Sequence, residues 1–111
     1  MKDDSTLRKT EDFNALYKKG KSSGSKYVVV LYKSNDTGLT RTAFIASKKV
    51  GNSVRRNRAR RLMKEALRLS GIVLPKGCDI LFIARSGIAD VKCADVQRSI
   101  EAALKRTGLT G

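Results

Sequence analysis

The segment Ser47–Ser70, SKKVGNSVRRNRARRLMKEALRLS, gathers more positive charge than its own acidic residues can balance. It holds six arginines and one lysine after Val54, and Glu65 is the only acidic residue among them. Like charges three or four positions apart destabilise a helix. Because arginine binds phosphate through two parallel hydrogen bonds, this segment predicts contact with a nucleic-acid backbone.

A helix from Asn52 or Ser53 to about Leu69, ended by Gly71, would place most of these charges on one face. The opposite face is an apolar stripe of Ala59, Leu62, Met63, Ala66, Leu67 and Leu69. A helix face that is only solvated mixes opposite charges, which this one does not. A membrane-surface helix is the weaker alternative, because the stripe is short, lacks aromatic residues and is needed for a core.

The catalytic set of a protein nuclease is missing from the sequence. There is no histidine, and the acidic residues are scattered, as with Asp3, Asp4, Asp36, Asp79, Asp90 and Asp95. A two-metal hydrolase needs clustered carboxylates, and a nucleophilic mechanism needs a base with an orienting partner. We therefore expect no catalytic residue in this chain and assign no metal ligand.

Composition indicates one basic domain. The 111 residues suffice for a single core, and 41% of them are hydrophobic. Lysine and arginine number 24 against 10 acidic residues, and the net charge of +14 favours nucleic acid as a partner. The sequence shows no membrane span and no secretory signal, so we expect a cytoplasmic protein without a membrane partner. Cys78 and Cys93 are expected to be reduced thiols.

The periodicity of apolar residues predicts a single α+β domain over residues 1–111. The expected helices, besides the basic one, are Thr10–Lys19 and Ala94–Arg106, the second with Val96, Ile100, Ala103 and Leu104 facing inward. The expected strands are Tyr27–Lys33, Thr40–Lys48 in antiparallel pairing with it, and Cys78–Arg85, buried on both faces. Lys21–Ser25 is either a loop or a short edge strand, and Ser86–Asp90 is a loop.

Three aromatic side chains favour single-stranded RNA over DNA. Phe13 and Tyr17 lie one turn apart in the first helix, and Tyr27 begins the first long strand. Exposed rings offer stacking surfaces to unpaired bases, and nothing in the sequence resembles a helix-turn-helix, a zinc finger or a zipper. An ordinary place in the core is an equal alternative for Phe13 and Tyr17.

The order of these motifs resembles the bacterial ribonuclease P protein family. In AFIASKKVGNSVRRNRARRLMKEALR, a strand ends in Ser47-Lys48-Lys49, Gly51-Asn52 follows, and Arg56-Asn57-Arg58 opens the basic helix. LRKTEDFNALYKKG (Leu7–Gly20) and DILFIAR (Asp79–Arg85) are similar to the family's opening helix and last strand. Together these pieces cover about half of the chain.

The resemblance implies a compact domain of order α-β-β-β-α-β-α with a left-handed β-α-β crossover, like the second domain of ribosomal protein S5. General preference would predict the right-handed crossover. The resemblance also implies a subunit that assists the catalytic RNA of ribonuclease P, which hydrolyses the 5′ leader from precursor tRNA. That RNA would hold the catalytic Mg²⁺ ions, and the protein alone would be inactive.

Residue roles also follow from the resemblance. The basic helix would meet the catalytic RNA through Arg55, Arg56, Asn57, Arg58, Arg60, Arg61, Lys64 and Arg68. Phosphates would bind to Lys48, Lys49 and Asn52. The single-stranded leader would lie in a cleft lined by Phe13, Tyr17, Tyr27, Val29 and Leu31, where Leu31 stands at a place for which an aromatic residue is expected. No obligate protein partner is expected.

Two other classes of protein share the size, the charge and the missing catalytic set. A structural RNA-binding protein, such as a ribosomal protein, requires neither the Ser47–Glu65 pattern nor an aromatic cleft. A DNA-packaging protein is expected to have a dimerisation surface, and the sequence offers no surplus apolar stripe for one.

Overall fold

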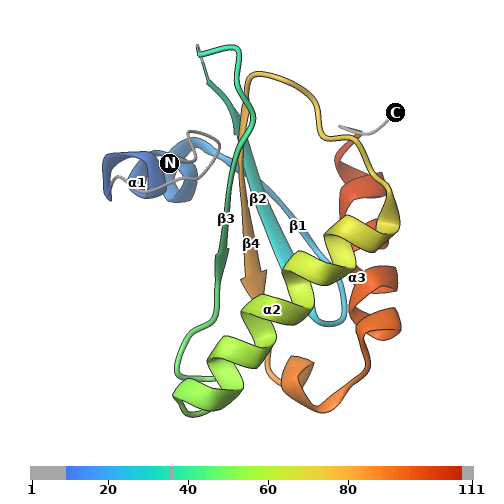
Figure 1. Cartoon of the computed structure of the whole chain (residues 1–111). Coiled ribbons are helices and arrows are strands. Elements are labelled where there is room, and N and C mark those ends of the chain that lie inside the picture. The colour runs from blue at the N-terminus through green and yellow to red at the C-terminus, as the bar shows by residue number, and fades with distance from the viewer. Residues whose placement is uncertain (1–9, 36, 109–111) are drawn as a thin grey trace, which may run out of the picture.

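The order of helices and strands in the computed structural model follows the order predicted from the sequence. The structure describes residues 10–35 and 37–108 (Figure 1). Its elements are α1 (Thr10–Lys19), β1 (Lys21–Gly24), β2 (Val28–Ser34), β3 (Arg41–Ile45), α2 (Ser53–Ser70), β4 (Cys78–Ala84), the short 3-10 helix η1 (Ile88–Asp90) and α3 (Cys93–Thr107). The segment that begins at Lys21 is thus the short edge strand rather than a loop, and the predicted loop before α3 contains a helical turn.

β4 lies inside the sheet, which corrects the predicted pairing of β3. The strand order is β1-β2-β4-β3; β2 is antiparallel to β1 and β4, and β3 is parallel to β4. The prediction that Thr40–Lys48 pairs antiparallel with Tyr27–Lys33 is therefore wrong. β4 is almost entirely buried, as predicted, because an apolar strand between two partners is covered on both faces and both edges. α2 connects the parallel strands β3 and β4, which is the β-α-β unit that the resemblance implies.

A buried ion pair fixes β3 beside β4. Asp79 is 5% exposed, and the Arg41 guanidinium donates to both of its carboxylate oxygens at 2.8 Å. The Asn35 side chain donates another hydrogen bond to Asp79 Oδ1 at 2.7 Å. Arg41 and Asp79 lie opposite each other in the parallel register. Because a buried carboxylate is strongly destabilising without such partners, this pair favours the observed register over a shifted one.

α2 and α3 cover one face of the sheet (Figure 1). Their buried residues are Ala59, Met63 and Ala66 of α2 and Val96, Ser99, Ile100, Ala103 and Leu104 of α3. The predicted inward stripe of α3 is confirmed, whereas Leu69, predicted in the stripe of α2, is 51% exposed. Since the apolar side of α2 is held against the sheet, its basic residues are left toward solvent.

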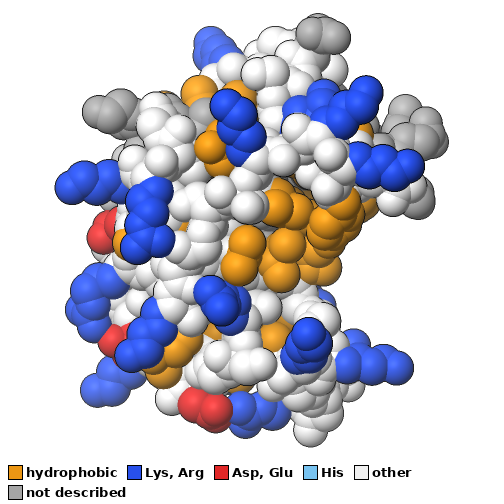
Figure 2. Space-filling model, turned by 180° about the vertical axis from the view of Figure 1, so that it is seen from behind, with side chains coloured by type: hydrophobic (Ala, Val, Ile, Leu, Met, Phe, Trp, Pro, Cys, Tyr) orange, Lys and Arg blue, Asp and Glu red, His pale blue; other side chains and the backbone are white. Residues whose placement is uncertain are grey.

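α1 covers only part of the opposite face of the sheet (Figure 1). Leu16 is its buried anchor, 1% exposed, and it packs against Leu81 of β4. Other apolar side chains of this face stay half-buried: Leu31, Ala43, Ile45 and Ile83. Figure 2, the view from behind, shows a hollowed apolar area on the surface. The fold therefore leaves an apolar sheet surface beside α1.

Two further observations concern the membrane and the cysteines. Within residues 10–35 and 37–108, no helix combines the length and the apolar character that a membrane span requires. Cys78 is buried in β4, Cys93 is partly exposed at the start of α3, and both are free thiols.

Candidate nucleic-acid interface

A tight basic turn leads from β3 into α2. Gly51 N–H donates to the Lys48 carbonyl at 3.1 Å, and buried Val50 anchors the turn. Lys48 and Lys49 are left exposed. Gly51 has a φ of +141°, and a Cβ there would lie 2.6 Å from Cδ of Arg55, so the arginine can pack over the turn only because this position is glycine. The turn thus holds two lysines beside the start of α2.

The N-terminus of α2 is positive and has no acidic residue in its own first turn. Asn52 caps the helix, and its side-chain oxygen accepts the Arg55 backbone N–H at 3.0 Å. The predicted phosphate ligand Asn52 therefore uses its oxygen for the helix, while its NH₂ group remains a donor. Since the helix dipole favours an anion here by about 0.3–1 kcal/mol, the dipole adds to the charges of Lys48 and Lys49.

Two of the predicted RNA-contacting arginines also fasten α2 to η1. Arg55 pairs with the Asp90 carboxylate at 2.8 Å, and its Nε donates to the Val50 carbonyl at 3.3 Å. Arg58 Nε donates to the Ala89 carbonyl at 2.9 Å. Arg58 is nevertheless exposed, so its other guanidinium N–H groups remain accessible to a phosphate. The prediction of a loop over Ser86–Asp90 did not include these tethers.

Other predicted residues are engaged within α2 itself. Arg60 donates to the Asn57 side-chain oxygen. Arg68 donates to both carboxylate oxygens of Glu65, at 2.9 and 2.5 Å. These hydrogen bonds lower the pKa of Glu65 and raise the pKa of Arg68. The guanidinium of Arg68 is therefore less available to a phosphate than the sequence predicts, because it already donates to a carboxylate.

The side chains of three cations of α2 make no hydrogen bond or ion pair with any described residue: Arg56, Arg61 and Lys64. The Nε of Arg56 is buried and finds no acceptor among those residues. Such an unsatisfied N–H costs roughly 1–3 kcal/mol. Arg61 and Lys64 are exposed and line shallow hollows along α2. Lys64 Nζ lies 5.9 Å from the centre of the Phe44 ring, over β3.

A second surface, here called the cleft, lies between α1 and the uncovered face of the sheet. Its floor consists of half-buried aliphatic side chains from three strands: Leu31, Ala43, Ile45 and Ile83. Phe13 packs on this cluster from α1, while Tyr17, one turn further, is 58% exposed. Phe13 is thus part of a small apolar cluster, and Tyr17 offers its ring to solvent. An exposed ring beside an apolar floor suits the stacking of an unpaired base.

Tyr27 does not belong to the cleft, which corrects the sequence prediction. β2 begins at Val28, so the alternation of the strand does not extend to Tyr27. The Tyr27 ring packs against the core under α2 and α3, and its backbone N–H donates to Ser99 Oγ of α3 at 2.9 Å. Val29 does share the cleft face, because it lies opposite Ile83 in the antiparallel register. The described aromatic residues of the cleft are therefore Phe13 and Tyr17.

β3 joins the cleft to the basic surface. Ala43 and Ile45 belong to the floor of the cleft, whereas Phe44, between them, belongs to the opposite face. The Phe44 ring stacks on Phe82, with ring centres 5.0 Å apart, and lies below Lys64. The basic turn with Lys48 follows the end of this strand directly. One extended partner can therefore contact both surfaces across a single edge strand.

Sequence similarity to known proteins identifies the family of this chain. The Ribonuclease P family pattern matches residues 1–108. The ribonuclease P protein component of Pelotomaculum thermopropionicum is 41% identical over 100 residues, which cover 90% of this chain and 89% of that protein. The chain belongs to the ribonuclease P protein family. The ribonuclease P protein component of Clostridioides difficile is 42% identical over 105 residues, which cover 94% of this chain and 92% of the relative.

Solved structures of the ribonuclease P protein family have the same fold. The RNase P protein of Staphylococcus aureus has a TM-score of 0.83 and 30% identity, covering 98% of this chain and 100% of that one. The RNase P protein of Thermotoga maritima has a TM-score of 0.78 and 33% identity, covering 91% and 96%. The predicted α+β fold is confirmed.

Within this ribonuclease P family chain, the described residues contain no group of three or more cysteine, aspartate or glutamate side chains placed to hold a metal ion. The residues that sequence reasoning missed are Ala43, Ile45 and Ile83 of the cleft floor. Their alternation along β3 and β4 was visible, but it points to the cleft only once β3 is known to lie parallel to β4.

Proposed function

We propose that this chain is the protein subunit of ribonuclease P and assists a catalytic RNA in removing the 5′ leader from precursor tRNA. The observation that carries this proposal is the cleft lying next to the basic face of α2, with only β3 between them. A single strand needs stacking surfaces, whereas a folded RNA is held mainly through its phosphates. The chain presents both kinds of surface side by side, and membership of the family supports the same function.

The leader lies in the cleft in this proposal. Its unpaired bases stack on Phe13 and Tyr17, and the aliphatic floor that includes Leu31 and Val29 keeps water from the stacked faces. Stacking of this kind contributes about 1–3 kcal/mol per base. Mature tRNA has no leader, so the gain in affinity applies to the precursor alone. Tyr27 has no part in this contact.

The basic face of α2 docks on the catalytic RNA. Arg56, Arg61 and Lys64 bind phosphates without giving up a partner inside the described chain, and Lys48 and Lys49 extend the contact along the turn. Arg55 and Arg58 keep α2 attached to η1. Each neutralised phosphate should contribute about 0.7–0.9 to the slope of log affinity against log salt concentration.

The hydrolytic chemistry belongs to the RNA. Mg²⁺ ions held mainly by the catalytic RNA would activate the water that attacks the scissile phosphate. The phosphate would stay on the 5′ end of the mature tRNA, and the leader would depart with a 3′ hydroxyl. The residues of this chain bind and orient: the cleft fixes the leader, and the basic face offsets the repulsion between two polyanions. Because lysine and arginine replace part of the counterion charge, the assembled enzyme should need less Mg²⁺ than the RNA alone.

The experiment that tests this function compares Phe13→Ala with Tyr27→Ala in the holoenzyme reconstituted with ribonuclease P RNA. Phe13→Ala should weaken binding of precursor tRNA by about 1–3 kcal/mol and leave binding of mature tRNA unchanged. Tyr27→Ala is the matched control, because it removes an aromatic ring outside the cleft and should keep the preference for precursor. Equal losses for both tRNAs in Phe13→Ala would reject the leader role. Binding to ribosomal RNA in place of ribonuclease P RNA would favour a structural RNA-binding protein.

A further inference from the structure

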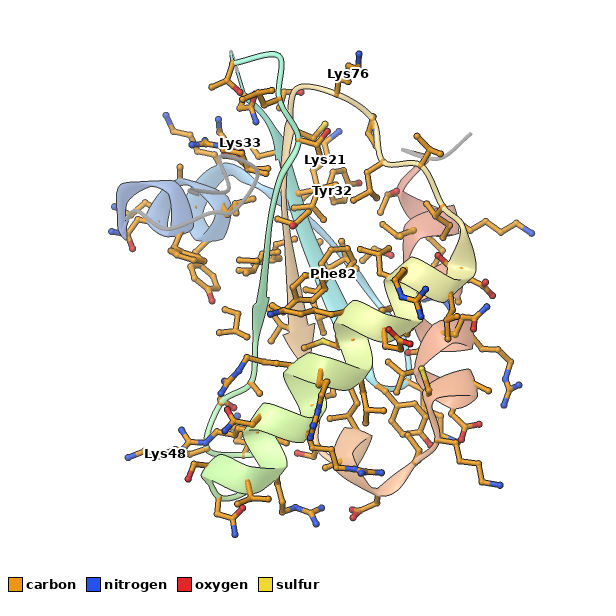
Figure 3. The ribbon with its side chains drawn as sticks, viewed as in Figure 1. Lys21, Tyr32, Lys33, Lys48, Lys76 and Phe82 are labelled. Carbon is orange, nitrogen blue, oxygen red and sulfur yellow. The ribbon has the colours of Figure 1, made fainter. Side chains whose placement is uncertain are left out.

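A hollow lined by lysines lies away from both surfaces described above. It has a volume of about 330 Å³ and opens where the ends of β1, β2 and α3 meet. Its lining includes Lys19, Lys21, Tyr32, Lys33, Ser34 and Thr107. Figure 3 shows Lys21, Tyr32, Lys33 and Lys76 at one end of the molecule and Lys48 at the other. This site is called the lysine hollow below.

The lysine side chains of the hollow have no counterion among the described residues. The side chains of Lys19 and Lys21 are exposed and make no hydrogen bond or ion pair with any described residue. Lys33 Nζ donates to the carbonyl of its neighbour Ser34 at 3.1 Å, which leaves its charge without a counterion. Among the described residues, none that lines the hollow carries a carboxylate. Three ammonium groups around one hollow repel one another, so an anion bound there would stabilise the site.

Another basic hollow lies near the β1–β2 turn, and its arginines, unlike the lysines above, have partners within the fold. Its lining includes Arg98 and Arg106. Arg98 pairs with Asp95 at 2.5 Å, and Arg106 donates to the Gly24 carbonyl. Those cations already have partners in the fold. The lysine hollow is therefore the stronger candidate for an outside ligand.

The side chains of the lysine hollow suit a single strand of nucleic acid. Lysine is a flexible point charge that binds phosphate without reading its geometry, in contrast to the planar fork of arginine. Tyr32 is half-buried in the lining and supplies a ring against which a base or sugar can pack. Lysines combined with an aromatic ring are typical of sequence-independent binding to single strands.

The position of the lysine hollow connects it to the cleft. Lys19 ends α1, the helix that brings Phe13 and Tyr17 to the cleft. Lys33 lies two residues beyond Leu31 and so projects from the same face of β2. A strand that leaves the cleft along β2, away from the basic turn, meets these two lysines first. Lys21 lies opposite Tyr32 on the edge strand β1 and so projects from the other face of the sheet, at the same end.

We propose that the lysine hollow binds the upstream nucleotides of the leader, beyond those in the cleft. The inference rests on the proposed function, in which the scissile phosphate lies near the catalytic RNA and therefore near α2. Leader nucleotides further from that phosphate extend toward the opposite end of the sheet, where the lysine hollow lies. Long leaders thus gain phosphate contacts that short leaders cannot reach.

The test uses the reconstituted holoenzyme and precursor tRNAs whose leaders grow by single nucleotides. With the unchanged protein, affinity should rise once when the leader fills the cleft and again when it reaches the lysine hollow. Lys21→Gln/Lys33→Gln should abolish the second rise and lower the salt slope for long leaders by about 1.4, at about 0.7 per phosphate. Affinity for short leaders should not change. Lys21→Arg/Lys33→Arg, which keeps the charge, should retain the second rise.

The matched control is Lys26→Gln/Lys105→Gln, which removes the same charge from exposed positions outside the lysine hollow. Equal losses in the control, equal losses for short and long leaders, or no loss at all would each overturn the proposal. If the double variant does not fold, Lys19→Gln at the end of α1 replaces it. Failure of the proposed function is distinct, because the unchanged holoenzyme would then bind a short-leader precursor no better than mature tRNA.

Discussion

The cleft and the basic face of α2 lie on the two sides of β3 and are built from opposite kinds of side chain. The cleft presents Phe13 and Tyr17 over an aliphatic floor, whereas α2 presents arginines and lysine with Glu65 as its one acidic residue. Phosphate contacts attract any RNA, but stacking needs unpaired bases. In the proposed function, affinity for RNA and preference for precursor over product therefore reside in separate surfaces of one small domain.

The two surfaces are also held in place by different contacts. α2 is fixed by its buried residues, such as Met63, and by the tethers from Arg55 and Arg58 to η1. α1, which forms one wall of the cleft, is anchored to the sheet by Leu16. A substitution can therefore disturb one surface and leave the other intact, which makes the comparison testable.

The largest effect is expected from Leu16→Ala, which should remove the cleft and spare the basic face. Replacing a fully buried leucine by alanine costs about 2–5 kcal/mol, and here the loss falls on the docking of α1. Hydrogen exchange of the α1 amides should accelerate more than that of α2. The holoenzyme should still assemble, but its preference for precursor over mature tRNA should disappear.

Leu39→Ala is the matched control for that change, because Leu39 is 51% exposed between β2 and β3. The same chemical truncation should leave both hydrogen exchange and tRNA preference unaltered. A Leu16→Ala protein that loses assembly with the catalytic RNA and the precursor preference in parallel would show that the two surfaces are not separable.

A smaller loss is expected from Arg61→Ala on the other surface. Arg61 is exposed and has no ion pair in the described chain, and alanine preserves the helix. Losing one charged hydrogen bond should weaken binding to the catalytic RNA by about 1.5–3 kcal/mol. The ratio of precursor to mature tRNA affinity should stay constant, and a changed ratio would contradict the division of roles. Arg68→Ala should weaken binding less, because Arg68 is already paired with Glu65.

The helices could be predicted because the necessary information lies within each segment. Apolar spacing predicted the inward stripe of α3, and the sequence predicted that α2 begins at Asn52 or Ser53 and is ended by Gly71. The charge pattern of Ser47–Ser70 likewise gave the basic face. The position of Phe13 and Tyr17 on one helical wall followed from their spacing of four.

The cleft floor could not be predicted, because it depends on contacts between distant segments. β3 pairs with β4 across the whole of α2, and the Arg41–Asp79 ion pair that favours this register joins residues 38 positions apart. Tyr27 was misplaced because strand alternation was extended one residue before β2 begins. The tether of Arg55 to Asp90 was missed for the same reason as the floor, since only the folded chain brings η1 to α2.

Leu31→Tyr is expected to raise the affinity for precursor tRNA, because it adds an aromatic ring to the cleft floor. Leu31 is half-buried between Ser22 and Leu81 in the sheet register. If a leader base reaches this place, stacking should strengthen precursor binding by about 1 kcal/mol, the low end for such contacts. Leu31→Met keeps the apolar bulk without a ring and should give no gain. Equal affinities for the two variants would mean that the floor supports the leader without stacking.

The smallest effect is expected from Glu65→Gln, which alters only the charge balance of the basic face. The hydrogen bonds from Arg68 lower the pKa of Glu65 below its ordinary value of 4.5. A lowered pKa means that the pair stabilises the fold at pH above the unfolded-state value, and that this contribution is lost as pH falls through the folded-state value. Because both side chains are exposed, the free energy of unfolding should change little at neutral pH.

Affinity for the catalytic RNA is the more sensitive measurement for Glu65→Gln. Removing the carboxylate frees Arg68 for a phosphate, so the salt slope should rise by up to about 0.9. Acidification through the pKa of Glu65 should produce the same rise in the unchanged protein and none in the variant. Glu101→Gln on α3, where the carboxylate accepts from Gln97 instead of an arginine, serves as the control. If both variants bind RNA with unchanged slopes, Arg68 lies outside the interface and the basic face ends before the last turn of α2.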